Sequence, residues 1–231
     1  MKPICFIAAR GGSKGIPRKN IKKFVDKPLI AYTIEKCLNS KIFSHVIIST
    51  EDDEIAKISK KYGAEVPFLR PKKLATDKAG TSDVLLHGIQ KLKNLGYDFD
   101  EIVLRDCTVP FIRNEDISQS IIKLRHKKSN AIFGVYRQHH NPYFNMMEKN
   151  SQGFLKLSKK LMDQPITRQE SPIVYQLSGL WVLNTLQFLK YRTIMLPKIL
   201  PYEITPESGF MIDNMLEFKI AEFMVSKNLI H

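Results

Sequence analysis

The chain has 231 residues, 43% of them apolar and 26% charged, which excludes a disordered or low-complexity protein. No apolar run approaches the roughly 18–20 residues of a membrane-spanning helix, and three cysteines without CxxC spacing argue against a disulfide framework or zinc cluster and predict a cytoplasmic protein. The formal net charge of +13 leaves nucleic acid, an anionic membrane and small anionic substrates as classes of partner.

Short apolar runs alternate with segments of helical period along residues 1–128, which predicts a doubly wound α/β sheet. The predicted strands are Ile4–Ala9, His45–Ser49, Val66–Leu69 and Ile102–Leu104. The predicted helices are Pro28–Asn39, one capped by Asp52 or Asp53 and ended by Gly63, one capped by Thr81 or Ser82 and closed by Gly96, and one capped by Asn114.

Fewer helices and strands are predicted in the second half of the chain. Ile132–Tyr136 and Leu180–Leu183 are further predicted strands, and an N-x-x-E pattern at Asn214 and Glu217 predicts the cap of a final helix. Residues 137–178 are richer in Pro, Gln, His and Asn, and we interpret them as a lid or oligomer arm. The sequence therefore predicts one α/β domain over residues 1–231 with helices on both faces of the sheet and a small insert.

The positive charge is concentrated at the start of the chain, where residues 1–30 contain eight Lys or Arg against Asp26 alone. Three glycines at positions 11, 12 and 15 let the loop after the first strand turn tightly, and Arg10, Ser13, Lys14 and Lys19 add donors around it. Such a loop suits a triphosphate better than it suits a basic surface turn. It matches neither GxGxxG nor a Walker loop. The second basic run, at residues 123–128, is interpreted as a solvated helix face.

Residues 9–20, ARGGSKGIPRKN, closely resemble the signature of the acylneuraminate cytidylyltransferases. The similarity continues through Leu29–Thr33, Ile48–Asp52, Phe68–Asp77 and Gln169–Leu183, and so covers nearly the whole chain. The resemblance implies a Rossmann-like nucleotidyltransferase sheet, a dimerisation or lid insert and a homodimer. It also implies that CTP and a 2-keto-3-deoxy sugar acid, a sialic-acid-like nonulosonic acid, give the CMP-sugar and pyrophosphate.

The resemblance also implies roles for residues of this sequence. Arg10, Lys14 and Lys19 would stabilise the reacting phosphates, and Arg168 would pair with the sugar carboxylate. The expected nucleotide-binding residues are Ala8, Ala9, Arg10, Gly11, Gly12, Ser13, Lys14, Asn20, Arg70, Ser82 and Asp106. The expected sugar-binding residues are Gln138, His140, Arg168, Gln176 and Ser178. For His140, a polar loop lining a cleft is an equal alternative.

A Mg²⁺ site is expected because the reaction builds charge on phosphate oxygens. The family usually has Asp-x-Asp before the last helix, whereas this chain has Met211, Ile212 and Asp213, and it has Asp106 where Gln is usual. We therefore predict that Asp106 and Asp213 together hold the metal. The alternatives are an acid favoured by a helix N-terminus for Asp213 and a turn aspartate for Asp106.

Three other interpretations remain open from the sequence. The acceptor could be pseudaminic, legionaminic or ketodeoxyoctonic acid, and the missing first aspartate allows a relative that binds nucleotide without turnover. A basic nucleic-acid-binding protein is disfavoured, because no helix-turn-helix, RNA-recognition or zinc pattern is present and the cations cluster among glycines. We expect neither a nucleic-acid nor a membrane partner.

Overall fold

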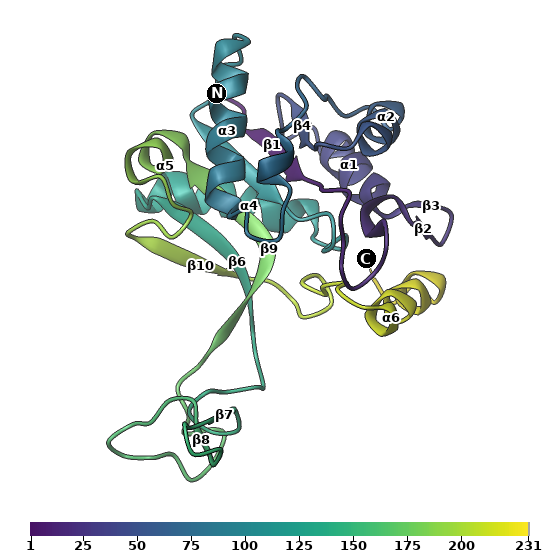
Figure 1. The fold of residues 1–231 in the computed structure, drawn as a ribbon. Helices are drawn as coiled ribbons and strands as arrows, with labels where there is room; N and C mark the ends of the chain where they lie inside the picture. Colours follow the sequence, from purple (N-terminus) through teal and green to yellow (C-terminus); the bar gives the residue numbers. More distant parts are fainter. Residues whose placement is uncertain (231) are drawn as a thin grey trace.

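Six strands form the central sheet of the computed structural model, which describes residues 1–230 (Figure 1). The strand order is β10-β6-β9-β5-β1-β4. Pairing is parallel for β1 with β4, β1 with β5 and β10 with β6, whereas β9 is antiparallel to both β5 and β6. The bounds are β1 Ile4–Ala8, β4 Val46–Ser49, β5 Glu101–Arg105, β6 Ala131–Arg137, β9 Tyr175–Asn184 and β10 Ile199–Glu203.

Helices cover both faces of this sheet, as the sequence predicted. Along β1, Cys5 and Ile7 face one layer while Ile4 and Phe6 face the other, which is the alternation of a strand buried on both sides. The first layer contains α1 (Leu29–Asn39), α2 (Asp53–Lys61) and α4 (Asn114–Lys127). The second contains α3 (Thr81–Asn94) and α5 (Thr185–Tyr191).

A smaller apolar cluster joins the two ends of the chain. It packs α6 (Met215–Ser226) against the hairpin of β2 (Lys23–Phe24) and β3 (Lys27–Pro28). The rings of Phe24 and Phe218 meet edge to face, with 5.3 Å between their centroids. The predicted capping box of α6 is present, because Asn214 and Glu217 each accept from the other's backbone N–H. The cluster therefore places the segment before α6 beside the loop that follows β1.

Several predicted elements differ in the structure. Residues 66–69 form no strand and make only an isolated bridge at Leu69, because Pro67 has no N–H to donate to a ladder. The N-cap of α3 is Gly80 rather than Thr81 or Ser82, and that of α4 is Arg113 rather than Asn114. Strand β10, which contains Pro201, was not predicted at all.

The insert forms an arm, which we define as residues 138–174. Figure 1 shows it extending from β6 and β9 away from the sheet, with β7 (Met147–Lys149) and β8 (Leu155–Leu157) paired near its end. Strand β9 was predicted over Leu180–Leu183 and is longer, so part of the predicted insert belongs to the sheet. Among residues 1–230, no helix is both long and apolar enough to cross a membrane. Short 3₁₀ turns lie at Lys19–Ile21 and Lys72–Leu74.

Candidate active site

A cavity of about 410 Å³ lies where the loops after β1 and β5 meet the segment before α6. Ligands of open α/β sheets bind at this carboxyl edge of the strands. We call residues 9–20, 50–52, 106–108 and 212–213 the nucleotide edge. The cavity is lined by Ala8, Arg10, Ser13, Lys14, Gly15, Lys19, Asn20, Asp106, Cys107, Thr108 and Asp213. The structure therefore brings together most of the predicted phosphate and metal residues.

The two cations at the start of the loop converge on one carboxylate. Arg10 Nη1 lies 2.9 Å from Asp77 Oδ1, and Lys14 Nζ lies 2.8 Å from Asp77 Oδ2. These two cations lower the pKa of Asp77, with Lys14 the larger influence. Because a single anionic group already bridges Arg10 and Lys14, their spacing suits the oxygens of a phosphate chain.

Lys19 is held at the opposite side of the cavity. Its Nζ donates to Ile212 O at 2.7 Å and to Asp213 Oδ1 at 2.9 Å, and its side chain is only 12% exposed. Gly15 supports the same contact, because a Cβ there would fall 2.1 Å from Asp213 O. The glycine at this position therefore lets the loop close against the segment before α6.

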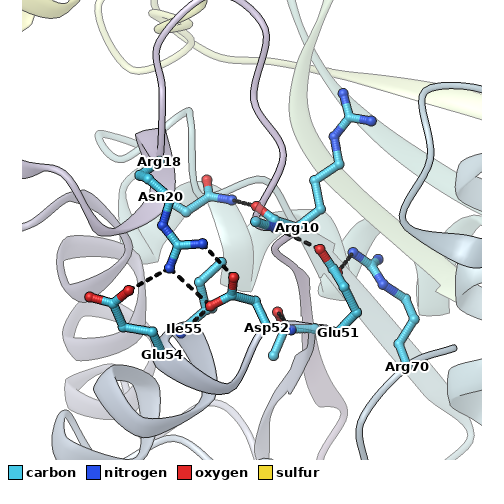
Figure 2. A network of polar contacts seen from close by, with 10 residues as sticks. Arg10, Arg18, Asn20, Glu51, Asp52, Glu54, Ile55 and Arg70 are labelled. Carbon is cyan, nitrogen blue, oxygen red and sulfur yellow. Dashed lines mark hydrogen bonds and ion pairs between the residues drawn. The ribbon is translucent and has the colours of Figure 1, made fainter. Parts of the chain in front are cut away.

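The other two glycines of the loop, which were predicted to contact the nucleotide, are not among the residues that line the cavity. Gly11 donates its N–H to Glu51 Oε1 at 2.7 Å, and a Cβ on Gly11 would fall 2.5 Å from Asp52 Oδ2 (Figure 2). A Cβ added at Gly12 would meet nothing within 4 Å. Ala9 is buried and donates its N–H to Ser49 O at 3.0 Å. Ala9, Gly11 and Gly12 are thus outside the lining of the cavity, and Gly11 faces the carboxylates of residues 51 and 52.

Asn20 lines the cavity with both ends of its amide engaged. Nδ2 donates to Arg10 O at 2.9 Å, and Oδ1 accepts from Cys107 Sγ at 3.0 Å. Burial raises the pKa of the Cys107 thiol to about 12, so it remains protonated and able to donate at neutral pH. Asn20 therefore connects the loop after β1 to the turn after β5.

Two carboxylates line the cavity, from different elements. Burial raises the pKa of Asp106, while the charge of Lys19 and contacts with Thr108 act against it. Asp106 N–H donates to Gly179 O at 2.9 Å, and Gly179 has φ +69° with a would-be Cβ 2.7 Å from Asp106 Cβ. Asp213 is 61% exposed and pairs with Lys19. A glycine on β9 thus allows the close approach that fixes Asp106.

This donor set suits Mg²⁺ when a triphosphate is present. Among residues 1–230, no group of three or more His, Cys, Asp or Glu side chains is arranged to hold a metal ion. Mg²⁺ at phosphate sites is commonly bound through one or two carboxylates plus substrate phosphates and waters. Asp106 and Asp213 supply the two carboxylates, and a cation would favour the ionised form of Asp106, whose pKa desolvation raises.

A second cavity of about 220 Å³ adjoins the first and shares Ala8 and Arg10 with it. Arg70 lines this cavity with its side chain only 3% exposed. Thr81 rather than Ser82 lies in its wall, because the Ser82 hydroxyl accepts from Ile194 N–H at 3.1 Å on the other side of the helix start.

The predicted sugar-binding residues lie in three different parts of the structure. Gln138, His140 and Gln176 line a cavity of about 600 Å³ at the root of the arm. Gln138 Nε2 donates to Gln176 Oε1 at 2.5 Å. Arg168 is exposed on the arm, and Ser178 is buried in β9. Within one copy of the chain, the structure does not bring Arg168 or Ser178 into the cavity of the other three.

Sequence reasoning missed three residues that shape these cavities: Glu51, Asp77 and Thr81. The first two lay inside segments used only for the family resemblance. Glu51 follows directly after a predicted strand, and the rule that ligands bind at strand ends could have identified it. Asp77 follows no regular element, and we find no sequence signal for its pairing with Arg10 and Lys14.

An α/β sheet that gathers glycines and cations at the carboxyl edge of its strands defines a nucleotide-binding enzyme of Rossmann-like type. The family model described as "Cytidylyltransferase" matches residues 4–190, and the chain belongs to that family. This confirms the family resemblance of the first loop.

Relatives matched over nearly their whole length support this assignment, and a solved structure shares the fold. The chain is 34% identical over 229 residues to post-translational flagellin modification protein B of Campylobacter coli, covering 98% of this chain and 96% of that protein. Identity is also 34%, over 232 residues with 98% and 96% coverage, to the CMP-N,N'-diacetyllegionaminic acid synthase of Campylobacter jejuni. A solved CMP:2-keto-3-deoxy-manno-octonic acid synthetase complexed with CTP shares the fold, with a TM-score of 0.75, 16% identity and coverage of 99% and 100%.

Proposed function

We propose that this cytidylyltransferase transfers CMP from CTP to the anomeric hydroxyl of a nonulosonic acid and releases pyrophosphate. One observation carries the proposal: a single cavity at the carboxyl edge of the sheet combines Arg10, Lys14 and Lys19 with the carboxylates of Asp106 and Asp213. The similarity to the legionaminic acid synthase over nearly the whole of both chains supports the class of acceptor.

The residues fit an in-line displacement at phosphorus. The anomeric oxygen forms a bond to the α-phosphorus and loses its proton to water, while the bond from the α-phosphorus to the bridging oxygen breaks and pyrophosphate leaves with the electron pair. Arg10 and Lys14 neutralise the leaving pyrophosphate, taking its oxygens in place of the Asp77 carboxylate that they now hold. Lys19, whose Nζ is held by Ile212 O and Asp213, would bind the α-phosphoryl oxygens.

Asp106 and Asp213 are the proposed Mg²⁺ residues. When bound, the ion supplies positive charge to the phosphate oxygens as negative charge develops on them. The protein's own contribution is to hold the two carboxylates in place, Asp106 through Gly179 on β9 and Asp213 through Lys19. Catalysis is then mostly positioning and electrostatic stabilisation.

The acceptor is an acidic sugar in this proposal, with Arg168 as the partner of its carboxylate and with Gln138, His140 and Gln176 near its hydroxyl and acyl groups. Legionaminic and pseudaminic acids are the nonulosonic acceptors favoured by the names of the relatives in Campylobacter jejuni. The pseudaminic acid cytidylyltransferase is 41% identical but over only 58% of each chain.

A homodimer belongs to the proposal, with the arm as the dimer contact. Its large apolar side chains are strongly exposed, with Met162 104%, Ile166 86% and Phe154 68% exposed. A second copy would cover this surface and bring a partner's Arg168 to the site. The proposed location is the cytoplasm, in keeping with three buried free thiols.

The test measures pyrophosphate release with each nucleoside triphosphate and a panel of nonulosonic and octulosonic acids, with and without Mg²⁺. CTP-selective, sugar-dependent and Mg²⁺-dependent release supports the proposal. Lys19→Ala should lower turnover about 100-fold, and Lys23→Ala, an exposed lysine outside the cavity, should leave it unchanged. CTP binding without release for any acid would instead indicate a nucleotide-binding relative without turnover.

A further inference from the structure

We infer that Glu51 is a positioning residue that holds the glycine loop and Arg70 in register for the nucleotide. This inference deepens the proposed function and rests on it. Figure 2 shows the carboxylate of Glu51 between the backbone of the loop and the guanidinium of Arg70. Glu51 itself lines neither nucleotide cavity, so it acts through its two partners.

One oxygen of Glu51 fixes the start of the loop. Gly11 N–H donates to Glu51 Oε1 at 2.7 Å, a charge-assisted hydrogen bond to a backbone group. On its other side, Gly11 is backed by the ion pair of Arg18 and Asp52, which leaves no room for a Cβ. The loop is therefore held at Gly11, next to Arg10, whose guanidinium serves both cavities.

The second oxygen of Glu51 compensates a buried cation. Arg70 Nη2 donates to Glu51 Oε2 at 3.0 Å, and the two side chains are 3% and 13% exposed. Arg70 Nε is buried without a hydrogen-bond partner among the described residues. A buried guanidinium is costly without an anion, and the carboxylate both stabilises it and leaves a donor for a ligand.

The sheet sets the position of Glu51. Strand β4 ends at Ser49 beside Ala8 of β1, and Arg70 N–H donates to Thr50 O at 2.8 Å. Glu51 thus stands on rigid backbone between two irregular segments that follow β1 and residue 69. The carboxylate of Glu51 therefore fixes the distance between the glycine loop, whose Arg10 would bind the phosphates, and Arg70, which would face the rest of the nucleotide.

The test compares CTP binding by Glu51→Gln, Glu51→Asp and a matched control, Glu54→Gln, by calorimetry. Gln keeps the shape but cannot accept from both partners, and we expect the Kd for CTP to rise about 10-fold or more. Asp keeps the charge but is too short to span both partners, and a smaller rise is expected. The Glu54→Gln variant removes the same charge, but from the exposed ion pair with Arg18. Its Kd for CTP should stay within about twofold of the wild-type value.

Steady-state kinetics separate positioning from a general loss of structure. We expect KM for CTP to rise in Glu51→Gln while KM for the sugar acid changes little. The melting temperature of the free protein should fall, because the buried guanidinium of Arg70 loses its anionic partner. In an Arg70→Gln background, part of the effect of Glu51→Gln should disappear, because the two residues share one contact.

Wild-type CTP affinity in both Glu51 variants would overturn the inference, and so would an equal loss in Glu54→Gln. If Glu51→Gln does not fold, the Glu51→Asp variant decides, and wild-type affinity there has the same consequence. A wild-type protein that binds CTP without transferring it contradicts the proposed function alone, since the Kd comparison still tests Glu51. A wild-type protein that does not bind CTP contradicts both.

Discussion

The nucleotide edge and the arm differ in how completely one copy of the chain satisfies its own side chains. At the nucleotide edge, Arg10, Lys14 and Lys19 each have a carboxylate partner. In the arm, Met162 and Ile166 are almost fully exposed. The edge is organised within one copy, whereas the arm carries apolar surface that its own chain does not cover.

Strand β9 runs through both regions and shows where the difference begins. Its first residues, Tyr175 and Leu177, are 40% and 36% exposed, whereas Leu180 and Val182 are fully buried in the first layer. The same strand therefore continues the sheet core at one end and leaves it at the other. Where β9 leaves the core to enter the arm, it is held by its backbone hydrogen bonds to β6 rather than by side-chain packing on both faces.

The largest effect is expected at the nucleotide edge. Asp106→Asn should lower Mg²⁺-dependent pyrophosphate release by about 1,000-fold, because the proposed metal site would lose a charged ligand. Burial raises the pKa of Asp106, so ionised Asp106 opposes folding at neutral pH, and the metal-free variant should melt no lower than wild type. Release assays and thermal unfolding check both, with the exposed acid Asp98→Asn as the control. Near-full turnover in Asp106→Asn would contradict the metal assignment.

The next largest effect is expected from substitutions that disrupt the proposed dimer contact of the arm and leave the nucleotide edge unchanged. Replacing Met162 and Ile166 together by Asp should give a monomer in analytical ultracentrifugation, because charges on a covered apolar surface are costly. The Kd for CTP should not change. Leu186→Asp, which is 66% exposed on α5, is the matched control and should remain dimeric. A double variant that stays dimeric would exclude this part of the arm from the contact.

A smaller effect sharpens the link between the regions. Arg168→Ala should raise KM for the sugar acid about 10-fold or more, because a carboxylate loses a charge-assisted pair, while KM for CTP stays unchanged. Arg192→Ala, an exposed arginine after α5, is the control. Equal changes in both KM values would show that Arg168 does not act on the sugar.

The smallest effect concerns the support of the glycine loop. Hydrogen bonds from Arg18 lower the pKa of Asp52, so this pair stabilises the fold above the ordinary pKa of Asp and loses that contribution as pH falls through the lowered value. The Asp52→Asn variant keeps the cap of α2. It should lower the free energy of unfolding by about 1 kcal/mol at neutral pH, and the loss is this small because solvent screens the charge of Arg18. Denaturant unfolding should show the difference vanishing once the pH has fallen below the lowered pKa of Asp52. A difference that persists there would point to lost packing instead.

The sequence predicted the parallel strands and the covering helices because buried runs such as Ile4–Ala8 have a clear period. It also placed Arg10, Lys14 and Lys19 in the loop after the first strand, Asp106 after a later strand and Asp213 before the last helix. The structure brings these five into one cavity. Other features depended on contacts distant in sequence. Gly11 faces carboxylates 40 residues later, and Ser82 meets a backbone group 112 residues later. No local pattern reports such pairings.

The contact of Lys19 with Ile212 and Asp213 spans 193 and 194 residues of sequence. During synthesis, the glycine loop is therefore made long before the segment that closes it. The cavity therefore becomes complete only when α6 has packed on the β2–β3 hairpin. Nucleotide affinity consequently reports that the chain has been made and folded as far as α6, and CTP would stabilise only such molecules.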